Sequence, residues 1–225
     1  MVGEQEMSGS LLFAIDGPSG SGKSTAAKLL ARRLGLGYLD TGAMYRAATS
    51  EYLARFPDGA SQEDVARLVE EADLVCETSP ETPRFWINGR DVTEAIREPR
   101  ISAAVSEVAT NHEVRRLLTG RMRELISAHD RRIVVEGRDI TTVVAPDADV
   151  RVLLVADPEA RVARRAAEVE GRATEAEVTD QVLRRDRDDS TVSNFTDAAE
   201  GVTVIDSTFL TPDEVVDAII ELVGD

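Results

Sequence analysis

The chain has 225 residues, 42% hydrophobic and 30% charged, and a net charge of −16, which fits one globular domain with room for a small insert. One cysteine and two histidines exclude a disulfide framework and the usual zinc sites, and no apolar run approaches the roughly 18 residues of a membrane span. The acidic balance argues against nucleic-acid binding, and the absence of basic residues in the first ten positions predicts a cytoplasmic protein.

The N-terminal part alternates apolar runs with helical patterns. Residues 11–15 are apolar and bounded by Asp-Gly-Pro, so they predict a buried strand. Residues 23–34 have helical periodicity and are followed by glycine, which predicts a helix. A short strand at 38–39 and a helix at 43–55 follow. Ser-Gln-Glu-Asp at 61–64 resembles a capping box and predicts a helix to about residue 71.

The middle of the chain has a different character. Residues 74–93 contain two prolines, a β-prone stretch and the dipeptide Asn88-Gly89, which strongly favours a hairpin turn. This pattern predicts a small β insert. Helical patterns return at residues 99–108 and 113–128.

The C-terminal part returns to the alternation of strands and helices. Strands are predicted at 133–135, 150–155 and 202–205, with helices from Asp157 to about 170, from 174 to 188, and from Thr211 onward. Strands that alternate with helices predict an α/β fold with a parallel sheet covered on both faces. The whole chain, residues 1–225, is predicted to be one domain.

A phosphate-binding motif lies between the first strand and the first helix. Residues 17–25 match G-x-x-x-x-G-K-[ST] in the strand–loop–helix context that this motif requires. The lysine adds a full charge near the β- and γ-phosphates, and Ser24 offers a hydroxyl to Mg²⁺. The residues predicted to bind ATP are Gly17, Pro18, Ser19, Gly20, Ser21, Gly22, Lys23, Ser24 and Thr25.

The other basic residues favour a kinase over a guanine-nucleotide switch. Neither lysine, Lys23 nor Lys28, belongs to the Asn-Lys-x-Asp motif that recognises guanine. Arg46 and Arg138 follow predicted strands, and the guanidinium group matches phosphate geometry, so a second phosphate site is expected. A phosphate acceptor is already ionised at neutral pH, so the transfer needs no general base.

Five segments in chain order resemble bacterial cytidylate kinase, and the similarity covers nearly the whole chain. They are residues 15–20 (IDGPSG), 39–46 (LDTGAMYR), 87–92 (INGRDV), 136–139 (EGRD) and 185–191 (RDRDDST). The resemblance implies that ATP phosphorylates CMP or dCMP to CDP or dCDP with Mg²⁺. It also implies a P-loop kinase fold with a five-stranded parallel sheet flanked by helices, and a protein that is a monomer.

The resemblance further implies how the chain is divided. Residues 11–60 and 109–225 would form the core. Residues 61–108 would form a monophosphate-binding insert that contains β structure, and residues from about 158 to 190 an arginine-rich lid.

The resemblance assigns roles residue by residue. Thr41 and Arg46 would contact the acceptor phosphate, and Lys23 would be catalytic together with Arg164 of the lid and Arg185. The cytosine side would be contacted by Ser106, Arg115, Arg138 and Asp139, while Arg185 and Asp189 would meet phosphate and ribose respectively.

The sequence departs from this family at two places, and other functions stay open. Thr141 stands where the family commonly has glycine, and residues 192–196 lack an expected arginine, so Arg187 would be one substitute. The alternatives are a P-loop kinase for another small acceptor, such as UMP or AMP, and a non-catalytic nucleotide-binding module. A nucleic-acid-dependent ATPase is disfavoured by the acidic charge.

Overall fold

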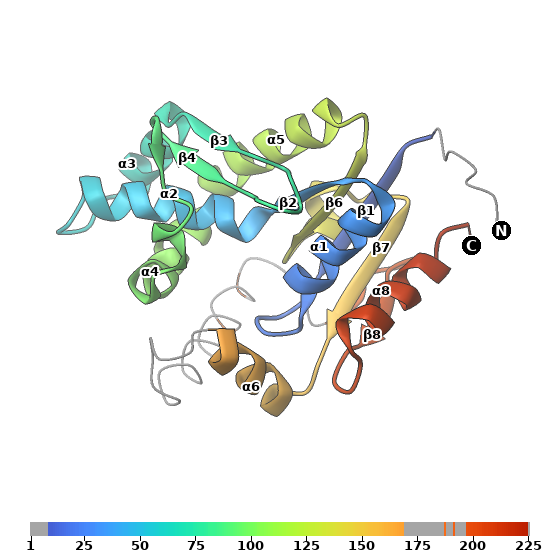
Figure 1. The fold of residues 1–225 in the computed structure, drawn as a ribbon. Coiled ribbons are helices and arrows are strands. Elements are labelled where there is room, and N and C mark those ends of the chain that lie inside the picture. Colours follow the sequence, from blue (N-terminus) through green and yellow to red (C-terminus); the bar gives the residue numbers. More distant parts are fainter. Residues whose placement is uncertain (1–8, 169–186, 188–190, 192–196, 225) are drawn as a thin grey trace.

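A five-stranded parallel sheet forms the centre of the computed structural model, which describes residues 9–168, 187, 191 and 197–224 (Figure 1). The strands lie in the order β2-β6-β1-β7-β8 and pair in parallel. They are β1 (Leu11–Asp16), β2 (Gly37–Asp40), β6 (Arg132–Gly137), β7 (Val150–Val155) and β8 (Thr203–Asp206). The predicted α/β fold with a five-stranded parallel sheet is confirmed.

Helices cover both faces of this sheet. Successive side chains of a strand point to opposite faces, and here both faces carry apolar side chains that must be buried. In β1, Leu11, Phe13 and Ile15 pack into one core, and Leu12 and Ala14 pack into the other. The first core is closed by α1 (Lys23–Leu34) and α8 (Pro212–Glu221). The second is closed by α2 (Thr41–Arg55), α5 (His112–Ala128) and a π-helical turn, η2 (Ile140–Val144).

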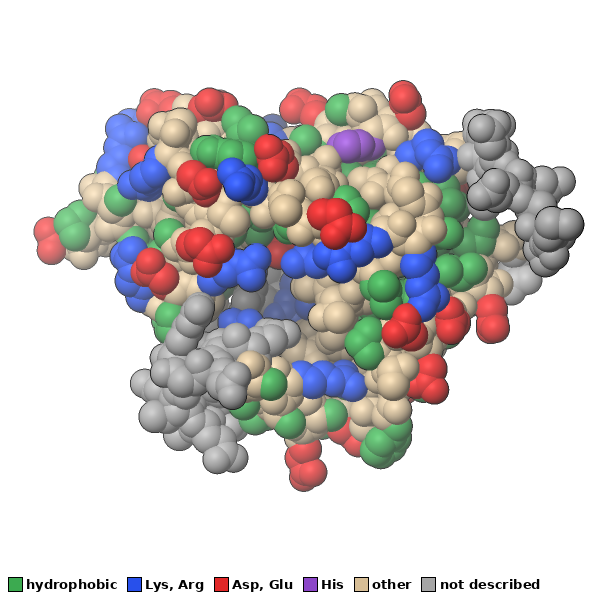
Figure 2. Space-filling view, viewed as in Figure 1, with side chains coloured by type: hydrophobic (Ala, Val, Ile, Leu, Met, Phe, Trp, Pro, Cys, Tyr) green, Lys and Arg blue, Asp and Glu red, His purple; other side chains and the backbone are tan. Residues whose placement is uncertain are grey.

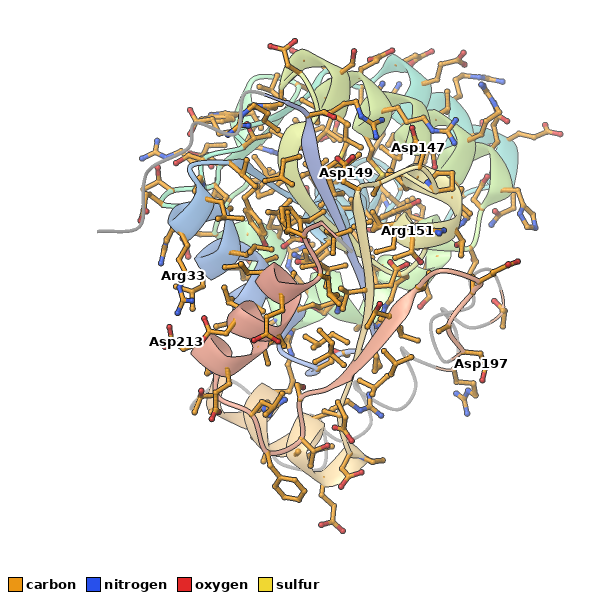
Figure 3. All side chains as sticks on the ribbon, turned by 90° about the vertical axis from the view of Figure 1, so that its right-hand side faces the viewer. Arg33, Asp147, Asp149, Arg151, Asp197 and Asp213 are labelled. Carbon is orange, nitrogen blue, oxygen red and sulfur yellow. The ribbon has the colours of Figure 1, made fainter. Side chains whose placement is uncertain are left out.

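An ion-pair cluster joins the two helices of the first face. Arg33 on α1 pairs with Asp213 and, at 2.6 Å between Nη1 and Oδ1, with Asp217 on α8. Arg33 and Asp213 lie toward each other across these helices in Figure 3. The cluster adds to the apolar packing of Val216 and Ile219 of α8, which are fully buried.

A second, smaller sheet lies beside α2. It is antiparallel, in the order β3-β4-β5, and its turn has positive φ at Asn88 (51°) and Gly89 (73°), as a tight hairpin requires. The predicted β insert is thus confirmed. The strands of this sheet are β3 (Leu74–Cys76), β4 (Phe85–Ile87) and β5 (Arg90–Asp91). The neighbouring elements in the chain are α3 (Gln62–Glu71), the 3₁₀ turn η1 (Ala95–Arg97) and α4 (Pro99–Ala109), and the segment 61–108 that holds them is called the insert below.

The arginine-bearing helix predicted after β7 is α6 (Pro158–Glu168). The predicted helix at 174–188, Arg187 excepted, and the altered segment at 192–196 fall outside the described residues. Among the helices that the structure describes, none is long and apolar enough to span a membrane.

Candidate active site

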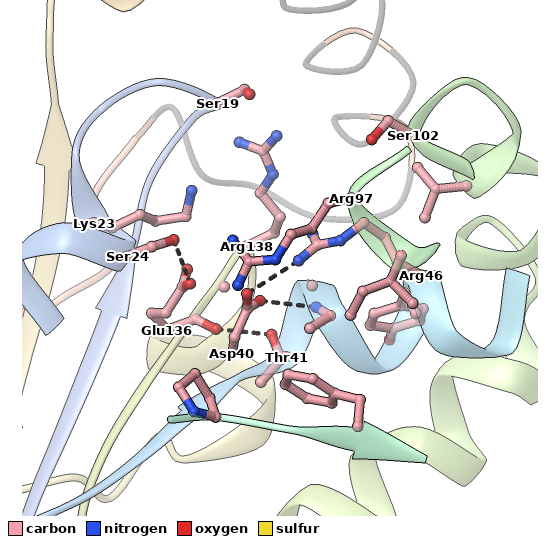
Figure 4. Close-up of a pocket in the computed structure, with 18 of the residues that line it drawn as sticks. Ser19, Lys23, Ser24, Asp40, Thr41, Arg46, Arg97, Ser102, Glu136 and Arg138 are labelled. Atoms are coloured by element: carbon pink, nitrogen blue, oxygen red, sulfur yellow. Dashed lines mark hydrogen bonds and ion pairs between the residues drawn. The ribbon is translucent and has the colours of Figure 1, made fainter. Parts of the chain in front are cut away.

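A cavity of about 520 Å³ opens where the strands β1, β2 and β6 end. Parallel strands place their carboxyl ends on one edge of the sheet, where ligands of α/β proteins bind. The register aligns Asp40 of β2 with Glu136 of β6, and Asp16 of β1 with Gly137. The cavity extends from the phosphate loop to α4 and η1 of the insert (Figure 4).

Basic side chains dominate the cavity wall although the whole chain is strongly acidic. Figure 2 shows basic groups around a hollow in the middle of the molecular face. Seven basic side chains line the cavity: Lys23, Lys28, Arg46, Arg97, Arg115, Arg138 and Arg165. Four acidic ones, Asp40, Glu94, Glu136 and Asp139, oppose them. This local excess of positive charge favours a multiply charged anion.

The phosphate loop has the backbone that its glycines predict. Gly20 has φ of 76°, and a Cβ there would lie 2.5 Å from the carbonyl oxygen of Arg161, so the loop and α6 approach too closely for a larger residue. The amino group of Lys23 lies 3.2 Å from the carbonyl oxygen of Pro18 and so crosses the loop. Helix α1 begins at Lys23, and the free amides and partial positive charge of its N-terminus favour the binding of phosphate.

Two carboxylates below the loop interact with the predicted site residues. The Ser24 hydroxyl donates to Glu136 at 2.6 Å, and Asp40 pairs with Arg46 at 3.0 Å (Figure 4). Burial and the nearby Asp40 charge raise the pKa of Glu136. Burial would also raise the pKa of Asp40, but the Arg46 guanidinium and the amide of Ala43 hold it below its usual value.

These groups provide the oxygen donors that Mg²⁺ prefers. A hydroxyl and a carboxylate within hydrogen-bond distance, beside a phosphate loop, fit an ion that takes its other ligands from phosphate and water. No role was predicted for Asp40 or Glu136 from the sequence. An acidic residue at the end of a buried strand was the pattern that could have identified both.

The residues expected on the acceptor side also meet in this cavity. Asp139 forms an ion pair with Arg115, whose guanidinium lies 5.8 Å from the centroid of the Tyr45 ring. Arg138 Nη1 donates to the carbonyl oxygen of Gly17 at 2.8 Å, and the Thr41 hydroxyl donates to that of Glu136 at 2.9 Å. Thr41, Arg46, Arg115, Arg138 and Asp139 all line the cavity.

Other predicted residues have different surroundings. Ser106 is not among the lining residues that the structure describes, whereas Ser102, four positions earlier on α4, is. Arg164 donates to the carbonyl oxygen of Ser207 at 2.6 Å and to its hydroxyl at 3.1 Å, while the neighbouring Arg165 lines the cavity. Arg185 and Asp189 fall outside the described residues.

Several lining residues come from the insert and were missed. Arg97 ends η1, Ser102 lies on α4, and Phe85 lies on β4. No periodicity or motif distinguishes these positions in the sequence. Their place in the cavity depends on how the insert packs against α2.

Comparisons with known proteins agree on one family. The family model described as cytidylate kinase matches residues 13–225. A cytidylate kinase of Cutibacterium acnes is 54% identical over 214 residues, which are 95% of this chain and 96% of that protein. A cytidylate kinase of Nocardia farcinica is 45% identical and covers 95% of this chain and 94% of its own length.

A solved structure with lower sequence similarity shares the fold. An uncharacterized protein from Eubacterium ventriosum superposes with a TM-score of 0.53 at 14% identity, covering 95% of this chain and 98% of that chain. At that identity the likeness concerns the fold alone.

Proposed function

The chain belongs to the cytidylate kinase family, and we infer that it transfers the γ-phosphoryl group of ATP to CMP and dCMP. It is therefore a phosphotransferase. The observation that carries the proposal for this site is a phosphate loop that shares one cationic cavity with the Arg115–Asp139 pair. The phosphate loop fits a nucleoside triphosphate, and the Arg115–Asp139 pair offers hydrogen-bond groups for a polar base.

On the donor side, residues 17–25 hold the phosphates of ATP. Lys23 neutralises charge that builds up on the transferred group, which is the main requirement of phosphoryl transfer. Arg164 and Arg185 are proposed to assist. Because Arg165 lines the cavity, it is a further candidate on the same helix as Arg164.

Mg²⁺ is proposed to bind together with ATP. Ser24 would be its protein ligand, with Glu136 beside it. The ion supplies neutralisation of charge on the phosphates of ATP.

On the acceptor side, Arg46 and Thr41 orient the monophosphate. Arg46 is already held by Asp40, so its guanidinium needs little reorganisation when a phosphate arrives. The Asp139 carboxylate would accept a hydrogen bond from the cytosine amino group. Ser106, Arg115 and Arg138 would support the base, and Arg185 and Asp189 would contact phosphate and ribose.

The remaining proposals concern the surroundings of the enzyme. We propose a monomer in the cytoplasm that binds neither nucleic acid nor membranes. The net charge of −16 supports the proposal on nucleic acid and membranes, because phosphate backbones and anionic lipids are repelled by an acidic surface.

An ADP-release assay with ATP and Mg²⁺ tests the function directly. It compares CMP, dCMP, UMP, AMP and GMP with a control that lacks an acceptor. Fast turnover with CMP and dCMP is the expected result. Preference for another monophosphate would contradict the assignment of the base, and ATP binding without any transfer would favour a non-catalytic module.

The base assignment predicts the effect of Asp139→Ala. Loss of the carboxylate removes a hydrogen-bond acceptor for cytosine and the ionic partner of Arg115, so the KM for CMP should rise by about tenfold or more. The KM for ATP should change much less. Steady-state kinetics with each substrate varied in turn provides the measurement, and an unchanged KM for CMP would count against this role.

A further inference from the structure

Asp16 is a buried carboxylate that the proposed chemistry does not use. It is the last residue of β1, directly before the phosphate loop, and only 1% of its surface is exposed. Its oxygens accept hydrogen bonds from the amides of Ile140 and Thr141, both at 2.8 Å, and from the Thr141 hydroxyl at 2.6 Å. A buried charge is tolerated only when such donors satisfy it.

The donors belong to the π-helical turn η2, which directly follows Asp139. Hydrogen bonds from Val144 to Asp139 (3.1 Å) and from Ala145 to Ile140 (2.8 Å) each span five residues, as a π-turn requires. The first amides of any helix lack partners within that helix. Asp16 therefore caps η2 from a neighbouring strand.

The Asp139 side chain lies next to this cap but takes no part in it. An aspartate at the N-cap normally accepts hydrogen bonds from the first turn of its own helix. Asp139 occupies the N-cap position of η2 but makes no side-chain cap bond. Asp16 satisfies the first amides instead, and the Asp139 carboxylate lies on the cavity wall, where it pairs with Arg115.

A second bond joins the same two segments. Arg138 Nη1 donates to the carbonyl oxygen of Gly17 at 2.8 Å, next to Asp16 in the chain. Residues 16–17, where the donor loop begins, are thereby linked to residues 138–141 on the acceptor side. Thr141 contributes a side-chain donor to this link, and its hydroxyl is 2.6 Å from Asp16.

We propose that Asp16 and Thr141 are positioning residues that set acceptor specificity by directing Asp139 into the cavity. This inference rests on the proposed function, because it assumes that Asp139 contacts the acceptor base. It predicts that loss of the hydrogen bond from the Thr141 hydroxyl to Asp16 weakens acceptor recognition and leaves ATP binding largely unchanged.

The test uses two variants of Thr141, and the first of them, Thr141→Val, has nearly the shape of threonine. Thr141→Val removes the hydroxyl and Thr141→Ser keeps it. We expect Thr141→Val to raise the KM for CMP about tenfold, as for loss of a hydrogen bond to a charged group. Its ratio of kcat/KM for CMP over UMP should also fall, with the KM for ATP within about twofold of wild type. Thr141→Ser should restore both values.

Ser50→Ala serves as the matched control. It removes another buried hydroxyl, which donates to the carbonyl oxygen of Ala47 at 2.8 Å within α2 and does not line the described cavity. Thermal unfolding of all variants is measured alongside the kinetics. A Thr141→Val protein that loses stability but keeps its KM and base preference overturns the proposal, as does an equal rise in KM for ATP and CMP.

Asp16→Asn provides a second, stronger perturbation, and its folding is checked by the same unfolding measurement. The wild-type acceptor panel separates this inference from the function itself. If the wild type prefers another monophosphate, the assignment of cytosine fails. The Thr141 series is then measured with the preferred acceptor, where an unchanged KM overturns the positioning role independently.

Discussion

Lys23 crosses the phosphate loop toward the carbonyl oxygen of Pro18 at 3.2 Å and lies on the cationic cavity wall. Lys23→Ala should lower kcat by several orders of magnitude, because neutralisation of charge on the transferred phosphoryl group is lost. The fold should stay intact, since α1 is anchored by its buried face. Steady-state turnover together with circular dichroism measures both effects, and near-wild-type turnover would contradict the role.

Cys76 illustrates a residue whose environment suppresses its chemistry. Burial, with the nearby Asp40 charge, raises the pKa of its thiol to about 12. The reactive thiolate is therefore scarce at pH 8, and a disulfide reagent such as DTNB should label native protein far more slowly than unfolded protein. Rapid labelling of the native protein, at the rate measured in denaturant, would be inconsistent with this environment.

The roles of single residues could be predicted where these residues belong to a local sequence motif. The spacing of Gly17, Gly22 and Lys23 indicated the phosphate loop without any tertiary information. Asp40 and Glu136 were missed because an acidic residue at the end of a buried strand is a weaker signal than a motif of fixed spacing. Their importance arises only when β2 and β6 lie side by side and align them.

At the scale of elements, α8 begins with a complete capping box. The Thr211 hydroxyl accepts from the Glu214 amide, and the Glu214 carboxylate accepts from the Thr211 amide at 2.8 Å. Thr211→Ala should lower the free energy of unfolding by about 1 kcal/mol at pH 7. Chemical denaturation measures the change, and a loss near zero would contradict the capping role.

The same box has a defined pH dependence. Hydrogen bonds from the amide and hydroxyl of Thr211 lower the pKa of Glu214 below its usual 4.5. A carboxyl whose pKa is lower in the folded protein stabilises the fold at any pH above its pKa in the unfolded chain. This contribution is lost as the pH falls through its pKa in the folded protein. The effect of Thr211→Ala should therefore be smaller at pH 3 than at pH 7, in a comparison of the same two proteins.

Elements with local determinants were predicted well, and those with distant determinants were not. The Asn88-Gly89 turn needs only its own two residues, and the structure has it where the sequence indicates. The turn η2 escaped prediction because its cap, Asp16, lies on another strand, 124 positions earlier in the chain than Ile140. Thr141, a departure at the sequence level, proves to be the hydroxyl donor of that contact.

At the scale of the molecule, two opposing electrostatic effects act on the substrates. The net charge of −16 repels ATP and CMP at long range, whereas the cavity attracts them locally. The Debye length is already about 10 Å at 0.1 M salt, so the long-range repulsion is largely screened there and the local attraction dominates. The KM for CMP should therefore rise between 0.1 and 0.5 M NaCl. A KM that falls with salt would show that the global repulsion controls binding.

The order of strands in the sheet was beyond sequence analysis. Alternating strands and helices indicate a parallel sheet, but they do not state that β6 lies between β2 and β1. For the same reason, the sequence could not show that Arg97 and Ser102 of the insert border the phosphate loop's cavity. Such placements depend on packing between segments far apart in the chain.

That strand order has a consequence for biosynthesis. The two strands that pair with β1 are β6 and β7, which come much later in the chain. β1, which leads into the phosphate loop, therefore emerges from the ribosome long before either neighbour has been made. At ordinary rates of translation this interval is on the order of ten seconds. During it, six residues that are all buried in the finished protein have no sheet to join. The nascent N-terminal segment thus exposes apolar side chains of the kind that chaperones bind, and β1 has both of its neighbours only after two-thirds of the chain has been made.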